Sequence, residues 1–292
     1  MSNYSIRDLE QLSGIKAHTL RIWEQRYDIL KPERTDTNIR TYDDKDLKLV
    51  LNIALLKDHG YKISEISKME ADEMSKEVMS ISDKQMNYPD QIHALTISML
   101  DLDEERFEKI VSTNTLQFGF ENMMVNIIYP FLSRIGTLWI TGSIGPAQEH
   151  FISNLIRQKL IVAIDGQLPS LRPGAKKYLM YLPEGEMHEI SLLFGNYIVR
   201  SRQNKVIYLG QSLPFNELSF ACQMHKPDYI FSVITSVPGQ DEIQRYVYKL
   251  AKEFPDSKIL LTGYQVVGQD IDCPDNVEVI TQIKQLMEIA AE

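Results

Sequence analysis

The hydrophobic pattern changes its period along the chain, and this change limits the possible folds more than any other feature. From about residue 88 to residue 163 the apolar residues recur at helical spacing, whereas beyond residue 177 short apolar runs alternate with helical stretches. That alternation is typical of βαβ units, in which a parallel sheet carries helices on both faces. The predicted strands occupy residues 178–182, 205–209, 228–234 and 258–262.

The region of helical periodicity is interrupted near residue 101, near residues 113–117 and at residues 142–146. These breaks divide it into four helices, which favours a bundle. On both sides of this region the periodicity is lost: residues 74–87 are polar, and residues 166–177 are rich in Pro, Gly and Lys. We predict a linker in each place.

The first 73 residues contain two short helical patterns separated by a tight turn. Ser5 is placed to cap the first helix, a Ser-Gly pair ends it, and a second helix is expected over residues 17–27. Residues 28–42 have turn-prone residues between extended flanks, which predicts a small β-hairpin, or wing, and Asp43 is placed to cap a further helix. In a helix-turn-helix protein the second helix lies in the major groove of DNA.

The sequence therefore predicts a multidomain α and α/β protein. Its C-terminal part is expected to hold a Rossmann-like (flavodoxin-like) parallel sheet. The predicted parts are a winged helix-turn-helix at residues 1–73, a linker at 74–87, a four-helix bundle at 88–165, a linker at 166–177 and an α/β domain at 178–292.

Charge is unevenly placed along the chain. The net charge is −9, but residues 1–70 hold 12 basic and 12 acidic residues, so the remainder carries the whole −9. An acidic protein can still bind DNA if its positive charges share one face, because phosphate attraction is local at physiological ionic strength. Arginine makes bidentate contacts with guanine or phosphate; the alternative is a solvated helix face with scattered charges. The candidate DNA contacts are Lys16, His18, Thr19, Arg21, Arg26, Arg34 and Arg40.

The run SIRDLEQLSGIKAHTLRIWEQRY, followed by LKPERTDTNIRTYDDKDL, resembles the winged helix-turn-helix of MerR-family transcription regulators. The Gly turn, the Thr-Leu-Arg-x-Trp-Glu helix, the Lys-Pro step and the Arg-x-Tyr of the wing occur in the same order. The resemblance implies dimers on a palindromic DNA operator, promoter distortion, and RNA polymerase as a candidate partner. It also implies that Arg21, Arg26, Arg40 and Tyr42 contact DNA, and that Leu9, Leu12, Leu20 and Trp23 form the core.

Glu186 and His188 follow the first predicted strand of the α/β domain. This is the carboxyl edge at which open α/β sheets bind ligands. His188 could coordinate a metal through one ring nitrogen while Glu186 accepts a hydrogen bond from the other. The alternative is a solvated loop histidine.

Three elements of the α/β domain resemble those of cobalamin-binding domains: Glu186-x-His188-x-x-Ser191, Ser232-Val233-Ile234 and Gly263-Tyr264. The resemblance implies that His188 is the lower axial ligand of cobalt. It also implies that the dimethylbenzimidazole tail of cobalamin enters a slot lined by the Ser and Gly elements.

Trp139, nine intervening residues and then Glu149-His150 resemble a motif in the helical bundle of B12-dependent MerR photoreceptors. The resemblance implies that Trp139 and Glu149 cover the upper axial face and the adenosyl group of adenosylcobalamin. The alternative makes Trp139 a bundle-core residue and Glu149 with His150 an exposed first helical turn.

Three positions depart from these families. Ser191 replaces a Gly at the start of a helix, and Tyr264 replaces the second Gly of the tail-binding loop, where its ring could fill the slot or stack on the tail. Ile140 replaces a His that ligates cobalt after photolysis. Light-driven ligation by two histidines is therefore not expected.

The chain lacks a run of about 18 apolar residues and a secretory start, and Cys222 and Cys273 match no zinc spacing. These features predict a cytoplasmic protein without membrane contact.

We predict a transcription regulator, not an enzyme, that senses adenosylcobalamin and couples it to dimer or tetramer formation and operator binding. One alternative is a cobalamin-independent regulator whose C-terminal domains serve oligomerisation or partner binding. A remote alternative is the B12 carrier component of a methyltransferase or mutase, which the N-terminal DNA-binding pattern argues against.

Overall fold

The computed structural model describes residues 4–35, 38–71, 73–74, 76–78, 88–140, 144–167 and 171–292, without the side chains of 137–140. The chain forms two compact units, Met1–Leu155 and Ile156–Glu292, called here the helical unit and the α/β unit. The predicted α and α/β class is confirmed. Within the described ranges, no helix combines the length and the apolar character needed to span a bilayer.

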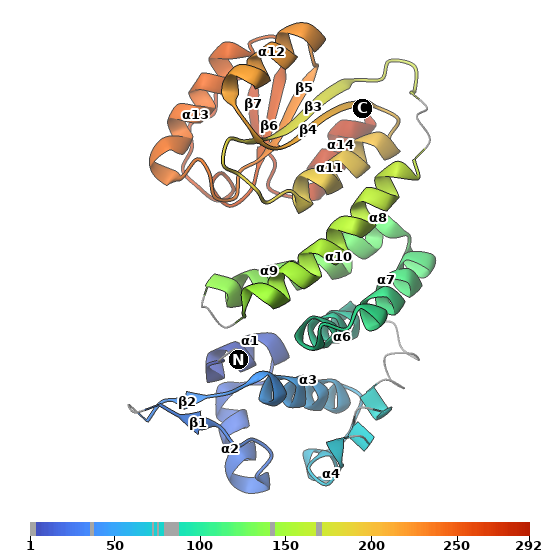
Figure 1. Cartoon of the computed structure of the whole chain (residues 1–292), viewed down its shortest axis with the longest axis vertical. Helices are drawn as coiled ribbons and strands as arrows, with labels where there is room; N and C mark the ends of the chain where they lie inside the picture. Colours follow the sequence, from blue (N-terminus) through green and yellow to red (C-terminus); the bar gives the residue numbers. More distant parts are fainter. Residues whose placement is uncertain are drawn as a thin grey trace. The chain divides into compact units, whose positions relative to one another are not determined.

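The helical unit begins with a winged helix-turn-helix (Figure 1). Ser5 caps the first helix through a capping box with Asp8, and Gly14, at φ +74°, ends it. Asp43 caps the third helix in the same way, as predicted. The elements are α1 (Ile6–Ser13), α2 (Ala17–Tyr27), β1 (Glu33–Arg34), β2 (Arg40–Thr41), α3 (Asp44–Asp58) and α4 (Ile63–Ile66).

The core of this part consists of the apolar residues that the sequence pattern places on the inner helix faces. Leu9 and Leu12 of α1 and Leu20 and Trp23 of α2 are buried. Lys57 at the end of α3 lies over the Trp23 ring, 5.0 Å from its centroid. The opposite face of α2, which includes Arg21 and Arg26, is exposed to solvent.

Four helical segments follow, as predicted, although one break is misplaced. The segments are α6 (Tyr88–Asp101), α7 (Glu104–Phe118), the continuous run of α8 (Phe120–Met123), the π-helix η1 (Met124–Ile128) and α9 (Tyr129–Ile140), and α10 (Pro146–Asp165). The break predicted near residues 113–117 lies slightly later, at Gly119, because α7 continues to Phe118. Thr113 and Asn114 donate side-chain hydrogen bonds to the carbonyls of Lys109 and Ile110, one turn back, and so remain within the helix.

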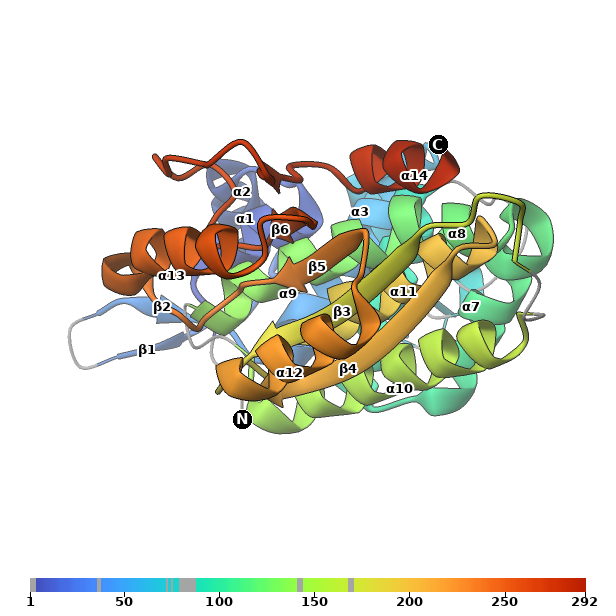
Figure 2. The same cartoon turned by 90° about the horizontal axis from the view of Figure 1, so that it is seen from above.

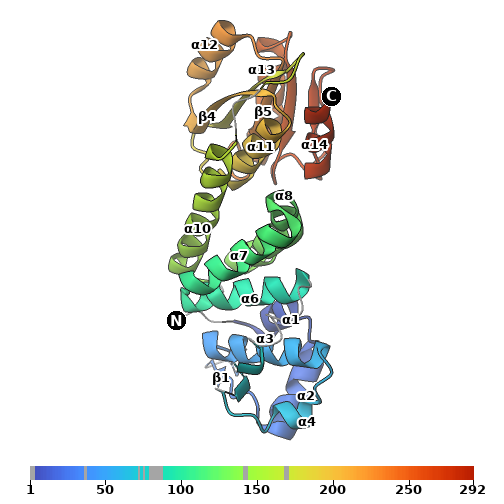
Figure 3. The ribbon, with the colours of Figure 1, turned by 90° about the vertical axis from the view of Figure 1, so that its right-hand side faces the viewer.

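Helix α6 joins the winged helix-turn-helix to the other helices of this unit (Figure 3). Every side chain from Asp90 to Leu100 is buried, because α3 packs on one side of α6 and α7 on the other. Lys48 of α3 forms an ion pair with Asp101, and His59, just after α3, lies 3.4 Å from the carboxylate of Asp90. The DNA-binding elements and α6 therefore share one core.

The α/β unit contains a five-stranded sheet in the order β4-β3-β5-β6-β7, and every pair of neighbouring strands is parallel. This is the flavodoxin-like order. Figure 2 shows β4 beside β3 in this sheet. The sequence pattern missed β7, which has only three residues. The elements are β3 (Lys177–Pro183), α11 (Ile190–Ser201), β4 (Lys205–Leu213), α12 (Phe215–His225), β5 (Tyr229–Val233), α13 (Gln240–Glu253), β6 (Lys258–Thr262), β7 (Val277–Val279) and α14 (Ile283–Ala291).

Helices cover both faces of the sheet. On one face, Leu179 and Tyr181 of β3 pack with the buried residues of α12 and α13. On the other face, the Tyr178 hydroxyl donates to the Ile289 carbonyl of α14, and Phe231 of β5 packs on Gly195 of α11. Because the strands are parallel, the loops after β3, β5 and β6 leave the same edge of the sheet.

Candidate ligand site and nucleic-acid interface

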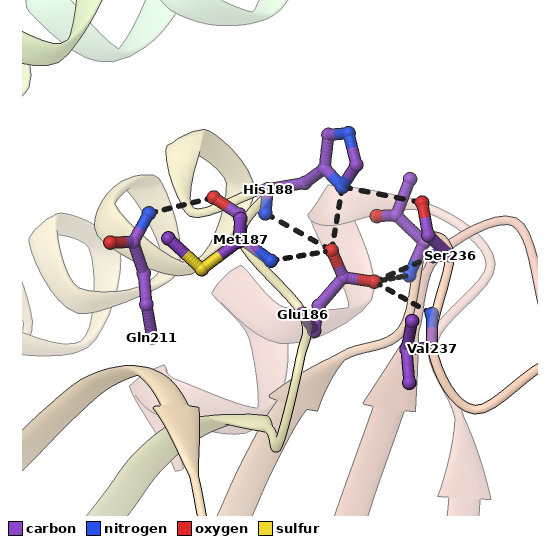
Figure 4. Close-up of polar contacts among 7 residues, drawn as sticks. Glu186, Met187, His188, Gln211, Ser236 and Val237 are labelled. Atoms are coloured by element: carbon purple, nitrogen blue, oxygen red, sulfur yellow. Dashed lines mark hydrogen bonds and ion pairs between the residues drawn. The ribbon is translucent and has the colours of Figure 1, made fainter.

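A buried carboxylate joins the loop after β3 to the loop after β5. Glu186 has no exposed surface. Its Oε1 accepts hydrogen bonds from the backbone N–H groups of Met187 at 2.9 Å and His188 at 3.0 Å. Its Oε2 accepts from the three consecutive N–H groups of Thr235, Ser236 and Val237 at 2.9, 2.5 and 3.2 Å (Figure 4). One side chain thus satisfies five backbone donors.

This hydrogen bonding keeps Glu186 ionised. Burial alone raises the pKa of the carboxyl group, but the Ser236 N–H, the His188 side chain and the N–H groups of His188 and Val237 lower it. The balance lowers the pKa of Glu186 from 4.5 to about 2. The carboxylate is therefore charged at any physiological pH.

The charged carboxylate orients the imidazole of His188. Nδ1 lies 2.6 Å from Oε1 of Glu186 and 3.4 Å from the Ser236 hydroxyl. An ionised carboxylate can only accept hydrogen bonds, so Nδ1 carries a proton and donates a hydrogen bond to Glu186. The side chain of His188 is 62% exposed, and Nε2 points away from Glu186 (Figure 4). The Nε2 atom, with its lone pair, is thus presented to solvent.

The other end of the His188 loop is also anchored. Glu189, the residue before α11, forms an ion pair with Arg157 of α10 and accepts a hydrogen bond from the Tyr208 hydroxyl at 3.4 Å. Gln211 of β4 donates to the Met187 carbonyl at 2.7 Å. The backbone on both sides of His188 is therefore held by side chains from α10 and β4.

Two of the predicted slot residues lie inside the α/β unit. Ser232 is buried in β5 and its hydroxyl donates to the Tyr181 carbonyl at 2.9 Å. Ile234 is part of the hydrophobic core. Ser191 lies half-buried in the first turn of α11. A ligand tail that accepted a hydrogen bond from the Ser232 hydroxyl would have to replace the bond to Tyr181.

Gly263 occupies a position that requires glycine. Its φ is +108°, and a Cβ there would lie 2.4 Å from the Ile234 carbonyl oxygen. Tyr264, which follows, is 70% exposed. Its ring therefore lies in solvent and does not fill the interior of the α/β unit.

The Trp139 motif belongs to the helical unit. The side chains of Trp139 and Ile140 lie outside the described part of the structure. Glu149 and His150 occupy the first turn of α10, where the carboxylate lies 2.7 Å from the His150 ring. The Ser153 hydroxyl contacts the same carboxylate at 3.0 Å, and His150 is exposed.

The predicted DNA-contacting residues differ in their exposure and in whether they already pair with another side chain. His18, Arg21 and Arg26 are exposed on α2, and Thr19 is half-buried there. Lys16 pairs with Glu10 at 3.0 Å, and Arg34 donates to the Asn38 side chain at 2.7 Å. Arg40 of the wing pairs with Glu24 of α2 at 3.0 Å, which fixes the wing to α2.

Tyr42 is a correction to the sequence interpretation. Its side chain is only 1% exposed, and burial is the main cause that raises the pKa of its hydroxyl. Its backbone pairs with that of Tyr4. Because the ring packs inside the winged helix-turn-helix, we assign Tyr42 to the core and not to the DNA contact.

Sequence reasoning missed three features. Ile22 and Gln25 share the exposed face of α2 with Arg21 and Arg26, and their three- and four-residue spacing would have shown this. The N–H groups that hold Glu186 come from residues 235–237. Every residue type except proline supplies such a donor, so the sequence carries almost no signal for them.

Comparison with known proteins matches two segments of the chain, which lie mainly in the helical unit. Residues 4–73 match the family described as MerR HTH family regulatory protein, and residues 91–163 match the B12 binding domain. The HTH-type transcriptional repressor CarH of Myxococcus xanthus is 28% identical over 246 residues, which cover 82% of this chain and 81% of CarH. The repressor CarA of the same organism is 26% identical, over 77% of this chain and 74% of CarA.

A solved structure shows the same fold. The monomethylamine corrinoid protein of Methanosarcina barkeri superposes with a TM-score of 0.52 at 10% identity, over 66% of this chain and 93% of that one. The chain is thus a MerR-type transcription regulator that carries a B12-binding domain. It is a distant homologue of CarH and CarA, which confirms the predicted resemblance and the prediction of a regulator instead of an enzyme.

We expect Glu186→Gln to destabilise the α/β unit at neutral pH, because the amide cannot accept five N–H donors as well as a carboxylate does. The folded-state pKa is depressed, so the stabilisation is present above pH 4.5 and is lost as the pH falls towards 2. At pH 7 the cost is about 3 kcal/mol. Urea unfolding followed by circular dichroism should show this difference shrinking between pH 4.5 and pH 2. A difference that is the same at both ends would contradict the role of the charge.

We expect Gly263→Ala to destabilise the chain more than Gly268→Ala. Both glycines have positive φ, but only at Gly263 would a Cβ meet the Ile234 backbone, whereas nothing lies within 4 Å at Gly268. The backbone strain common to both is about 1 kcal/mol, and the overlap adds about 1–3 kcal/mol. Equal melting temperatures for the two variants would show that the Gly263 loop shifts freely.

Proposed function

We propose that this MerR-type regulator senses adenosylcobalamin, with His188 as the lower axial ligand of cobalt. The bound corrin supplies a metal ion with an axial position that an imidazole nitrogen can fill. The main support is the geometry of the His188 ring: Nδ1 donates a hydrogen bond to the buried Glu186 carboxylate, while Nε2 faces solvent. This is the arrangement that fixes and strengthens a metal-binding imidazole.

The residues around His188 fit a large, planar ligand. Glu186 and Glu189 hold the loop on both sides of His188, so the ring need not be reorganised on binding. Tyr264, in the loop after β6, is exposed, so its ring is free to stack on a ligand. Trp139 and Glu149 of the helical unit are proposed to cover the upper face, with His150 beside them.

Binding is proposed to control assembly and hence DNA binding. A ligand shifts an equilibrium between assemblies only if its affinity for them differs. We propose that adenosylcobalamin favours one state, a dimer or a tetramer, which binds a palindromic operator in the cytoplasm and changes access of RNA polymerase to the promoter. The shared core of α3 and α6 supports this coupling, because a change in the bundle reaches the DNA-binding elements through packed side chains.

The rival proposal is a regulator that works without cobalamin. Ser191 in place of Gly and the occupied Ser232 hydroxyl favour it. In that case the C-terminal domains would serve oligomerisation or a protein partner.

A dark titration with adenosylcobalamin, followed by visible spectroscopy, tests the ligand. We expect the spectrum of the base-off, histidine-ligated form with wild type and with the control His225→Ala, whose histidine is exposed on α12. His188→Ala should lose this spectrum. Sedimentation of the same samples should show a change of assembly only where the spectrum appears. Absence of bound corrinoid in wild type would favour the cobalamin-independent regulator.

Arg40→Ala should weaken binding to all DNA sequences if Arg40 holds a phosphate. Loss of one phosphate contact lowers the slope of log affinity against log salt by about 1. In Arg40→Ala the Glu24 carboxylate loses its partner and repels the DNA phosphates. The double variant Glu24→Gln/Arg40→Ala removes this repulsion, so it measures the loss of the phosphate contact alone. Arg245→Ala, an exposed arginine of α13, is the control. If Arg40→Ala kept the salt dependence of the wild type, Arg40 would not contact a phosphate.

A further inference from the structure

One face of α2 is fully exposed and has the composition of a base-reading surface. It consists of residues spaced i, i+3, i+4, i+7 and i+8, and the opposite face, with Leu20 and Trp23, is buried. We call it the reading face; its members are His18, Arg21, Ile22, Gln25 and Arg26.

We propose that Gln25 and Ile22 determine the DNA sequence that this regulator selects, Gln25 by pairing with an adenine and Ile22 by packing on a thymine methyl group. The proposal rests on the DNA-binding function of the winged helix-turn-helix. It goes further because it assigns base readout to two uncharged residues and predicts A·T pairs within each operator half-site.

Ile22 is an apolar residue among polar ones. It is 50% exposed, and its neighbours along the reading face are His18, Gln25 and Arg26, one turn away on either side. A single exposed isoleucine is common on protein surfaces. Here it stands at the centre of the face that enters the groove, where the thymine C5-methyl is the one apolar group a base pair presents.

Gln25 has its amide free for a ligand. Among the residues that the structure describes, none forms a hydrogen bond with its side chain, and the side chain is exposed. The glutamine amide holds an NH2 donor group and a carbonyl acceptor in one plane, and adenine presents the N7 acceptor and the N6 donor in the complementary arrangement.

The charges around the reading face suit DNA. The acidic side chains nearest to α2 in sequence are each neutralised by a basic partner, so Arg21 and Arg26 give the face a positive charge. The three ion pairs are Glu10–Lys16, Glu24–Arg40 and Asp28–Lys31. The occupant we assign is therefore the major groove of duplex DNA.

The spacing of the two residues predicts where their bases lie. Side chains three apart on a helix have Cβ atoms about 5–6 Å apart, and base pairs are stacked about 3.4 Å apart. The adenine and the methyl group thus belong to the same base pair or to adjacent ones.

The full-length protein is first used to select duplexes from a random pool, which yields the preferred half-site. In that duplex, 7-deazaadenine removes the N7 acceptor and deoxyuridine removes the methyl group of thymine. We expect 7-deazaadenine at one position to lower the affinity of the wild type about tenfold, and to leave the affinity of Gln25→Ala unchanged. We expect deoxyuridine at one position to lower the affinity of the wild type several-fold, and to leave the affinity of Ile22→Ala unchanged.

Two matched variants control for loss of stability. Gln11→Ala removes an exposed glutamine from α1, and Leu116→Ala removes an exposed leucine from α7. Both should keep the wild-type response to each modified base, and all variants should keep the wild-type salt slope.

Two failures are distinguishable. If wild type selects a sequence but Gln25→Ala and Ile22→Ala respond to the modified bases as wild type does, the readout by Gln25 and Ile22 is wrong and DNA binding stands. If wild type selects no duplex, sequence-specific DNA binding itself is wrong, and the inference falls with it.

Discussion

The ligand site depends on one buried charge. The Glu186 carboxylate accepts five backbone N–H groups, two from its own loop and three from the loop after β5. A carboxylate can be buried only if its hydrogen bonds replace those of water. The same bonds that stabilise the charge therefore lock two loops together and hold the imidazole of His188 with Nε2 outward. The loop structure and the orientation of the His188 ring are two consequences of one desolvated group.

At the other end of the chain, α2 has two faces with different tasks. Its inner face packs Leu20 and Trp23 into the core, and its outer face is free for DNA. The Glu24–Arg40 pair connects α2 with the wing, so the two DNA-binding elements are held together before DNA is present. Through α3 they share the buried helix α6 with the region that matches the B12 binding domain. Within the helical unit, packed side chains therefore connect the DNA-binding elements with that region.

Much of the fold could be predicted because local signals agreed with the tertiary structure. The caps at Ser5 and Asp43 and the apolar runs of β3, β5 and β6 lie where the pattern placed them. The pattern failed where a local signal was weak or misleading. β7 is too short to show a period, and the polar residues near Thr113 satisfy themselves by bonding one turn back within α7.

The sequence by itself determined the order of the elements, the MerR-type segment and the pairing of Glu186 with His188, because each depends on spacing along the chain. Only the tertiary structure decided that Tyr42 is core, that Tyr264 stays outside the interior, and that residues 235–237 supply donors to Glu186. The physical reason is that burial and backbone hydrogen bonding between distant loops depend on how strands and helices pack. No local periodicity encodes that packing.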